Sequence, residues 1–71
     1  MKKEELSKKI GKRIIQIREK KGMTQAELAN VCMKDRQSIE RIEKGNTNPT
    51  IYTLHEIAQA LGVSLSTLVD I

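Results

Sequence analysis

Residues 36–44 have the pattern of a helix with many hydrogen-bonding side chains and only two apolar ones. In the stretch RQSIERIEK the two apolar residues, Ile39 and Ile42, fall on one side of a helix. The other side carries long polar side chains, several with flat, forked ends: Arg36, Gln37, Glu40, Arg41 and Lys44. Arg can pair with guanine through two hydrogen bonds, and Gln with adenine, at base edges in the major groove. This face is therefore a candidate for contacts with duplex DNA.

The same face also has a simpler interpretation as a solvated helix surface. Glu40 lies four positions from both Arg36 and Lys44, so ion pairs along the helix could account for the charges. Such pairs contribute only about 0.2–0.5 kcal/mol each. This helix alone does not decide between the two interpretations.

The preceding segment favours the DNA interpretation. TQAE predicts a helix that opens with a capping box, in which Thr24 and Glu27 each satisfy a backbone N–H of the other. Asp35 is expected to cap the next helix, so only residues 32–34 separate the two. Two short helices with so tight a turn cross steeply, which exposes the second and brings the start of the first to a nucleic-acid backbone. Gln25, in that first turn, could then contact a phosphate.

The remaining segments also predict helices, since none alternates in the manner of a strand. The first helix is expected over residues 4–21, ended by Gly22. Gly11 inside it costs about 1 kcal/mol relative to Ala, so close approach of another helix is expected there. The apolar face of this helix comprises Leu6, Ile10, Ile14 and Ile17.

Two more helices follow the polar loop NTNPT. Thr50 and Ser64 are their expected caps, and Gly62 ends the first of them. The inward-facing stripe predicted for this fourth helix is Ile51, Leu54, Ile57, Ala58 and Leu61.

Together these segments resemble the Cro/cI-type helix-turn-helix family, also called XRE-like, over roughly residues 10–69. The resemblance implies an all-α, five-helix, lambda-repressor-like domain over residues 1–71, with the motif core at about residues 24–44. It also implies a regulator of transcription that binds double-stranded DNA as a homodimer, on an inverted-repeat operator. The residues that carry it are Gln25, Leu28, Ala29, Ile39, Arg41, Ile42, Glu43, Gly45, Asn48, Pro49, Leu54, Ile57, Ala58, Leu61, Gly62, Val63 and Ser64.

The resemblance also assigns roles to residues of this chain. The residues expected to contact bases are Arg36, Gln37, Glu40 and Arg41. Those expected to contact the DNA backbone are Gln25, Ser38, Lys44, Asn46, Thr47 and Asn48. Arg18 and Glu43 match a partly buried ion pair that ties the first helix to the third. Where the family usually has Gly, this chain has Met33, which either takes a left-handed conformation at a cost of about 1 kcal/mol or packs inward in a different turn.

The C-terminal segment contains more apolar residues than a terminal turn needs to cover a core. We expect part of it to form a two-fold interface, which would set two equivalent helices about 34 Å apart. The alternative is that Leu65 and Leu68 only cap the core. The residues expected at the interface are Val63, Leu65, Leu68, Val69 and Ile71.

Composition limits the other possibilities. Residues 1–22 hold nine Lys and Arg against three Glu, whereas the remainder holds four against six acidic residues. A basic end permits binding of a polyanion but is equally typical of solvated helices. The single cysteine, Cys32, excludes an internal disulfide, and no apolar run is long enough for a signal peptide or membrane span. We therefore expect a cytoplasmic protein with no membrane partner.

Nothing in the chain predicts catalysis. There is no nucleophile–base pair, phosphate-binding glycine loop or metal cluster, so we expect no enzyme activity, cofactor, metal or small-molecule ligand. Cys32 is expected to be buried and inert, and His55 to lie on the surface.

Two alternatives stay open. The domain could be an antitoxin or a restriction–modification controller, with the same DNA chemistry and, for an antitoxin, a toxin or other protein partner. It could also be a pure protein-interaction module.

Overall fold

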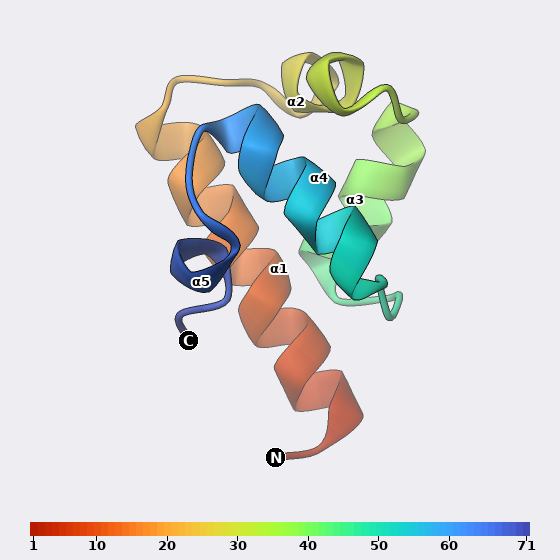
Figure 1. Ribbon diagram of the computed structural model, residues 1–71. Helices are drawn as coiled ribbons and strands as arrows, with labels where there is room; N and C mark the ends of the chain where they lie inside the picture. Colours follow the sequence, from red (N-terminus) through yellow and green to blue (C-terminus); the bar gives the residue numbers. More distant parts are fainter.

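The computed structural model describes all of residues 1–71 as five helices joined by short loops (Figure 1). The all-α, five-helix prediction is thereby confirmed. None of these helices is both long and apolar enough to cross a membrane. The helices are α1 (Lys3–Lys20), α2 (Gln25–Cys32), α3 (Arg36–Lys44), α4 (Ile51–Leu61) and α5 (Leu65–Leu68).

The last four helices begin at the caps expected from the sequence. The Thr24 hydroxyl accepts from the N–H of Glu27 at 3.1 Å, and the Glu27 carboxylate accepts from the N–H of Thr24 at 2.8 Å, which confirms the capping box. Asp35, Thr50 and Ser64 likewise accept from backbone N–H groups in the first turns of α3, α4 and α5. The starts of these helices are therefore set by local sequence.

Apolar side chains from every helix meet in one core. Its completely enclosed members are one residue from each helix: Ile14, Leu28, Ile39, Ile57 and Leu68. Leu68 is 0% exposed in the single chain and has no surface left for a partner, so its predicted place in a dimer interface is wrong. Cys32 is buried as expected, and burial raises the pKa of its thiol.

Two residues predicted to face the core lie on the surface instead. Leu6 is 42% exposed because the first turns of α1 extend beyond the other helices (Figure 1). Ile51 is 74% exposed, because the first residue of α4 lies at the edge of its apolar stripe and no neighbouring element covers it. The predictions for both residues are wrong, and both remain as exposed apolar surface.

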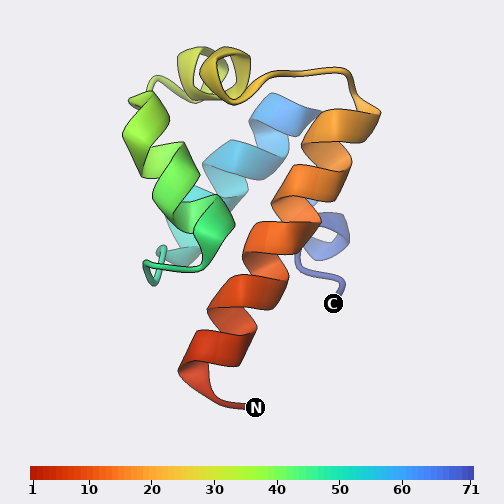
Figure 2. The same ribbon diagram turned by 180° about the vertical axis from the view of Figure 1, so that it is seen from behind.

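α1 crosses the end of α3 at Gly11. A Cβ atom on Gly11 would lie 2.3 Å from the carbonyl oxygen of Glu43 and 2.7 Å from that of Ile42. Backbone atoms this close cannot move away unless α3 moves, so the position requires glycine and the predicted close approach is confirmed. Figure 2 shows α3 beside α1, with the α3–α4 loop at the lower end of α3 and the first turns of α1 extending below it.

One residue of the turn between α2 and α3 has a left-handed backbone conformation. Met33 has φ 58° and ψ 39°, and the N–H groups of Met33 and Lys34 bond to the carbonyls of Asn30 and Ala29. Met33 is 92% exposed as a residue, so the alternative in which it packs inward is wrong. The chain therefore forms the turn despite a side chain that disfavours it.

Replacing Met33 with Gly should stabilise the protein by up to about 1 kcal/mol, because glycine adopts this conformation without steric cost. Urea denaturation would measure the change as a higher midpoint. Met33→Ala is the matched control and should give no comparable gain, since it keeps the Cβ atom. A lower midpoint for Met33→Gly than for the wild type would contradict this account of the turn.

Candidate nucleic-acid interface

α3 presents its polar side to solvent, as the spacing of residues 36–44 predicts. It runs at a steep angle to α2 along one side of the molecule (Figure 2). Ile39, Ile42 and Glu43 are buried beneath it. The outward side chains are Arg36, Gln37, Arg41 and Lys44, which are exposed, and Glu40, which is half-buried. We call these five residues the polar face of α3.

The charges on the polar face are only partly neutralised. Lys44 Nζ lies 3.8 Å from Glu40, a weak pair on an exposed helix. The predicted alternative pair between Arg36 and Glu40 does not form, and neither Arg36 nor Arg41 has an ion-pair partner. Two guanidinium groups are therefore free to donate hydrogen bonds outward.

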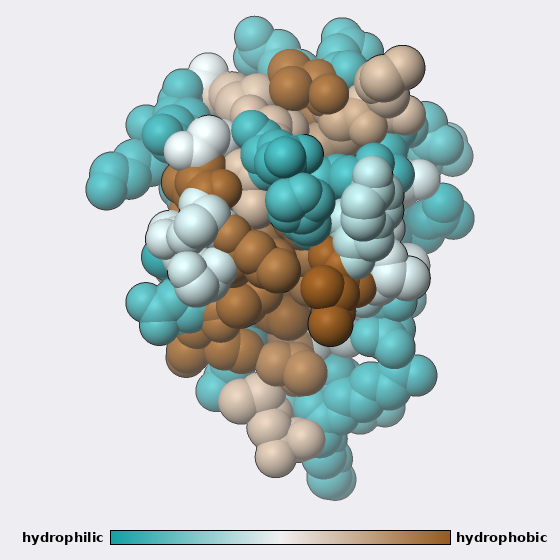
Figure 3. Space-filling view, viewed as in Figure 1, coloured by the Kyte–Doolittle hydropathy of each residue, from teal (hydrophilic) through white to brown (hydrophobic).

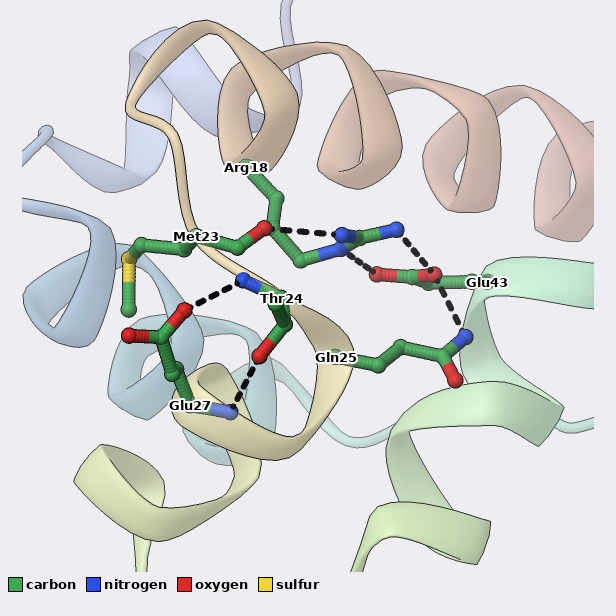
Figure 4. A network of polar contacts seen from close by, with 6 residues as sticks. All are labelled: Arg18, Met23, Thr24, Gln25, Glu27 and Glu43. Atoms are coloured by element: carbon green, nitrogen blue, oxygen red, sulfur yellow. Dashed lines mark hydrogen bonds and ion pairs between the residues drawn. The ribbon is translucent and has the colours of Figure 1, made fainter.

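A buried carboxylate joins the three helices that set the position of the polar face. Glu43 accepts from Arg18 Nε at 2.7 Å and Nη2 at 3.2 Å, a two-point pair between α3 and α1 (Figure 4). Arg18 Nη1 also donates to the carbonyl of Met23 at 2.9 Å. The Arg18 and Glu43 side chains are only 13% and 2% exposed, so the ion pair expected from the family resemblance is present and largely buried.

The same carboxylate holds Gln25. The Gln25 Nε2 atom donates to Glu43 Oε1 at 2.9 Å, which ties the start of α2 to the end of α3 (Figure 4). An amide nitrogen carries two hydrogens, so one N–H of Gln25 remains for another acceptor. Sequence reasoning missed this bond, because no spacing rule relates residues that meet only through tertiary packing.

The loop after α3 is held close to α1. Gly45 has φ 76°, and a Cβ atom there would lie 2.7 Å from the side chain of Lys8. Asn46 and Asn48 are exposed beyond this glycine, whereas Thr47 is half-buried and its hydroxyl has no hydrogen-bond partner. The loop residues expected to contact the DNA backbone therefore lie at the C-terminal end of the polar face.

The side chain that caps the start of α3 favours its charged form. Asp35 accepts a hydrogen bond from the N–H of Ser38 at 2.7 Å. This bond lowers the pKa of the Asp35 carboxyl below its ordinary value. Ser38 is half-buried at the edge of the polar face next to α4.

Hydrophobic surface is concentrated on a different side of the molecule. It covers α5, the adjoining part of α1 and the start of α4 (Figure 3). Val69 is half-buried, and the Nε of Arg13 donates to the carbonyl of Thr67, which holds α5 against α1. We call this surface the apolar face; its residues are Leu6, Ile10, Ile51, Leu65, Val69 and Ile71.

The fold agrees with that of known helix-turn-helix proteins. A helix-turn-helix family model matches residues 14–68. The chain therefore belongs to the Cro/cI-type helix-turn-helix family and is a transcriptional regulator with a helix-turn-helix DNA-binding fold.

Two curated relatives support this assignment. The chain is 40% identical over 60 residues to the uncharacterized HTH-type transcriptional regulator y4dJ of Sinorhizobium fredii, a match that covers 84% of this chain and 78% of that protein. It is 37% identical over 60 residues to the immunity repressor protein of Bacillus phage phi105, of which the match covers only 42%. The second relative is thus much longer than the part it shares.

A solved structure has nearly the same architecture over its whole length. The restriction-modification controller protein C.AhdI from Aeromonas hydrophila superimposes with a TM-score of 0.91 at 26% identity. The match covers 96% of this chain and 99% of that one.

The Glu43 network makes a prediction about stability. Glu43→Ala should destabilise the protein by about 3–5 kcal/mol, because it leaves the Arg18 guanidinium buried without its carboxylate. Chemical denaturation monitored by circular dichroism would measure the loss. The double variant Arg18→Met with Glu43→Leu is the matched control and should recover most of it, since no unpaired charge remains. A loss below about 1 kcal/mol for Glu43→Ala would refute the buried-pair account.

Proposed function

We propose that the protein regulates transcription by binding an inverted-repeat operator as a homodimer. The observation that carries this proposal is the polar face of α3, which exposes two unpaired guanidinium groups beside an amide on the second helix of a helix-turn-helix. In this arrangement the second helix enters the major groove. Arg36, Gln37, Glu40 and Arg41 would contact base edges there.

Backbone contacts would lie beside the polar face and at its C-terminal end. On the α2 side, Gln25 keeps an N–H free while Glu43 holds its amide in place. At the C-terminal end, Lys44 and the exposed Asn46 and Asn48 would position the duplex together with Thr47. Ser38, at the α4 side, completes the set of backbone contacts.

A second copy of the chain is the partner that best fits the apolar face. Small proteins seldom expose a contiguous apolar patch without an interaction that covers it. Two copies joined through this face would need to set their α3 helices about 34 Å apart, one duplex turn, to contact both halves of an inverted repeat. The interface would use Val63, Leu65, Val69 and Ile71 as expected from the sequence, joined by Leu6 and Ile51.

A role as a restriction–modification controller is a more specific version of the same function. It is favoured by the match to C.AhdI, which extends over 99% of that controller. An antitoxin would use the same DNA chemistry and add a toxin as partner. The genes beside the coding sequence and the position of the bound site would separate these contexts. A pure protein-interaction module would instead show no salt-dependent affinity for DNA.

Arg41→Ala should weaken binding to the cognate duplex by about 1–3 kcal/mol and relax the sequence preference, because a base contact is lost. The cognate duplex would first be recovered by selection from a random pool, and affinities would be measured by fluorescence anisotropy. Equal affinities of wild type and variant for cognate and random duplexes would exclude a base contact from Arg41.

Lys44→Ala serves as the contrasting variant. It should weaken all sequences alike and reduce the slope of log affinity against log salt by about one, because a phosphate contact is lost rather than a base contact.

Ile51→Asp and Leu65→Asp should each convert the dimer to a monomer, because they place a charge in an apolar contact. Light scattering would report the mass. Ile51 is 74% exposed, so its replacement should not unfold the chain. Val31→Asp is the control, since Val31 is also exposed but lies on α2, outside the apolar face. A wild-type protein that is monomeric at micromolar concentration, free and on DNA, would rule out the homodimer.

A further inference from the structure

A polar groove separates α3 from the start of α4, along the border of the polar face that carries Ser38. Four parts of the chain contribute to it: the α2–α3 turn, α3, the α3–α4 loop and the first turn of α4. No carboxylate lines the groove, and one of its nine lining residues is hydrophobic. Its main polar residues are Lys34, Ser38, Arg41, Thr47, Thr50 and Thr53.

The chemistry of the groove suits an anion of the size and charge of a phosphodiester. Lys34 and Arg41 supply positive charge, and the hydroxyl groups of Ser38, Thr47 and Thr53 can donate hydrogen bonds. The Thr50 hydroxyl instead donates to Thr53 Oγ1 at 3.0 Å. The Thr47 hydroxyl has no hydrogen-bond partner within the chain. Phosphate oxygens in protein–DNA complexes are bound mainly by such Lys, Arg, Ser and Thr side chains.

Lys34 is held in position before any ligand arrives. Its Nζ lies 3.0 Å from the carboxylate of Glu56 on α4, and its side chain is 26% exposed. Its backbone N–H bonds to the carbonyl of Ala29 at 2.9 Å. An ammonium group has three N–H donors, so the pair with Glu56 leaves others for a phosphate. Little side-chain freedom would be lost on binding.

The groove and Gln25 lie on opposite borders of the polar face. Ser38 lines the groove, and Glu43 holds Gln25. These two α3 residues are five positions apart, so they are separated by about 140° around the helix axis on the side that faces the core. The polar face occupies the remaining, outward-facing arc between them. A helix in the major groove has one DNA strand on each side.

We propose that this groove binds a backbone phosphate, with Lys34 as its principal cation, on the DNA strand opposite the one that Gln25 contacts. The proposal rests on the DNA-binding function proposed above and adds Lys34 and Thr53 to its contacts. Glu56 is a positioning residue in this scheme, since it acts through Lys34. The two borders together would clamp both strands around α3 and so fix its depth and angle in the groove.

Lys34→Gln tests the proposal. It should lower the affinity for the selected duplex and for random duplexes by similar factors, and reduce the slope of log affinity against log salt by about one. Lys20→Gln is the matched control, because Lys20 is an exposed residue at the end of α1 and its replacement removes the same charge. It should leave the slope nearly unchanged. Matching denaturation midpoints would show that both variants fold.

Duplexes with a single uncharged methylphosphonate linkage then locate the contact. The linkage that Lys34 contacts should weaken binding by the wild type but should not weaken binding by Lys34→Gln any further. The linkage that Gln25 contacts is identified in the same way with Gln25→Ala. The two linkages should lie on opposite strands. Equal salt slopes for wild type and Lys34→Gln, or both linkages on one strand, would overturn the proposal. Absence of wild-type binding to every duplex would instead overturn the proposed function itself.

Discussion

The carboxylate of Glu43 is the group on which the geometry of this protein depends most. Glu43 is 4% exposed, and its carboxylate on α3 accepts hydrogen bonds from side chains of α1 and α2. The backbone carbonyl oxygen of Glu43 also lies against Gly11, where α1 and α3 approach too closely for any side chain. One end of α3 is therefore fixed by charge pairing and by steric contact at the same place. Such buried pairs are weak evidence for net stability but can set the orientation of an element.

This arrangement explains how a short helix can present so polar a surface. α3 has nine residues, of which two are apolar and buried, and its burial alone would stabilise it little. The Asp35 cap and the left-handed Gly45 set its two ends, and the Arg18–Glu43–Gln25 network sets its angle. The polar face can then consist almost wholly of exposed groups that contribute nothing to the core. The proposed DNA contact therefore uses the side of the helix opposite to the one that stabilises the fold.

Much of the fold could be predicted because its determinants are local. Side-chain caps such as Thr24 and Asp35 act within three residues, and the apolar spacing of α1 and α4 follows the helical repeat. The errors arose where a neighbouring element decides the outcome. Ile51 lies at the edge of a stripe that nothing covers, whereas Leu68 is completely enclosed by α5 packing inward.

The candidate site was predictable to a similar extent. The outward orientation of Arg36, Gln37 and Arg41 followed from the helical periodicity. The Arg18–Glu43 pair followed from the family resemblance. The Gln25–Glu43 bond and the Lys34–Glu56 pair join residues 18 and 22 positions apart, on elements whose contacts no local rule specifies. Only the assembled fold brings them together.

The central claim is that the polar face of α3 lies in the major groove. Dimethyl sulfate footprinting on a selected duplex tests it most directly, because the reagent modifies guanine N7 in the major groove and adenine N3 in the minor groove. The account predicts protection of guanine N7 in two patches about one helical turn apart, with adenine N3 between them still reactive. Protection confined to adenine N3, or unprotected guanine N7 in a duplex that is demonstrably bound, would contradict it.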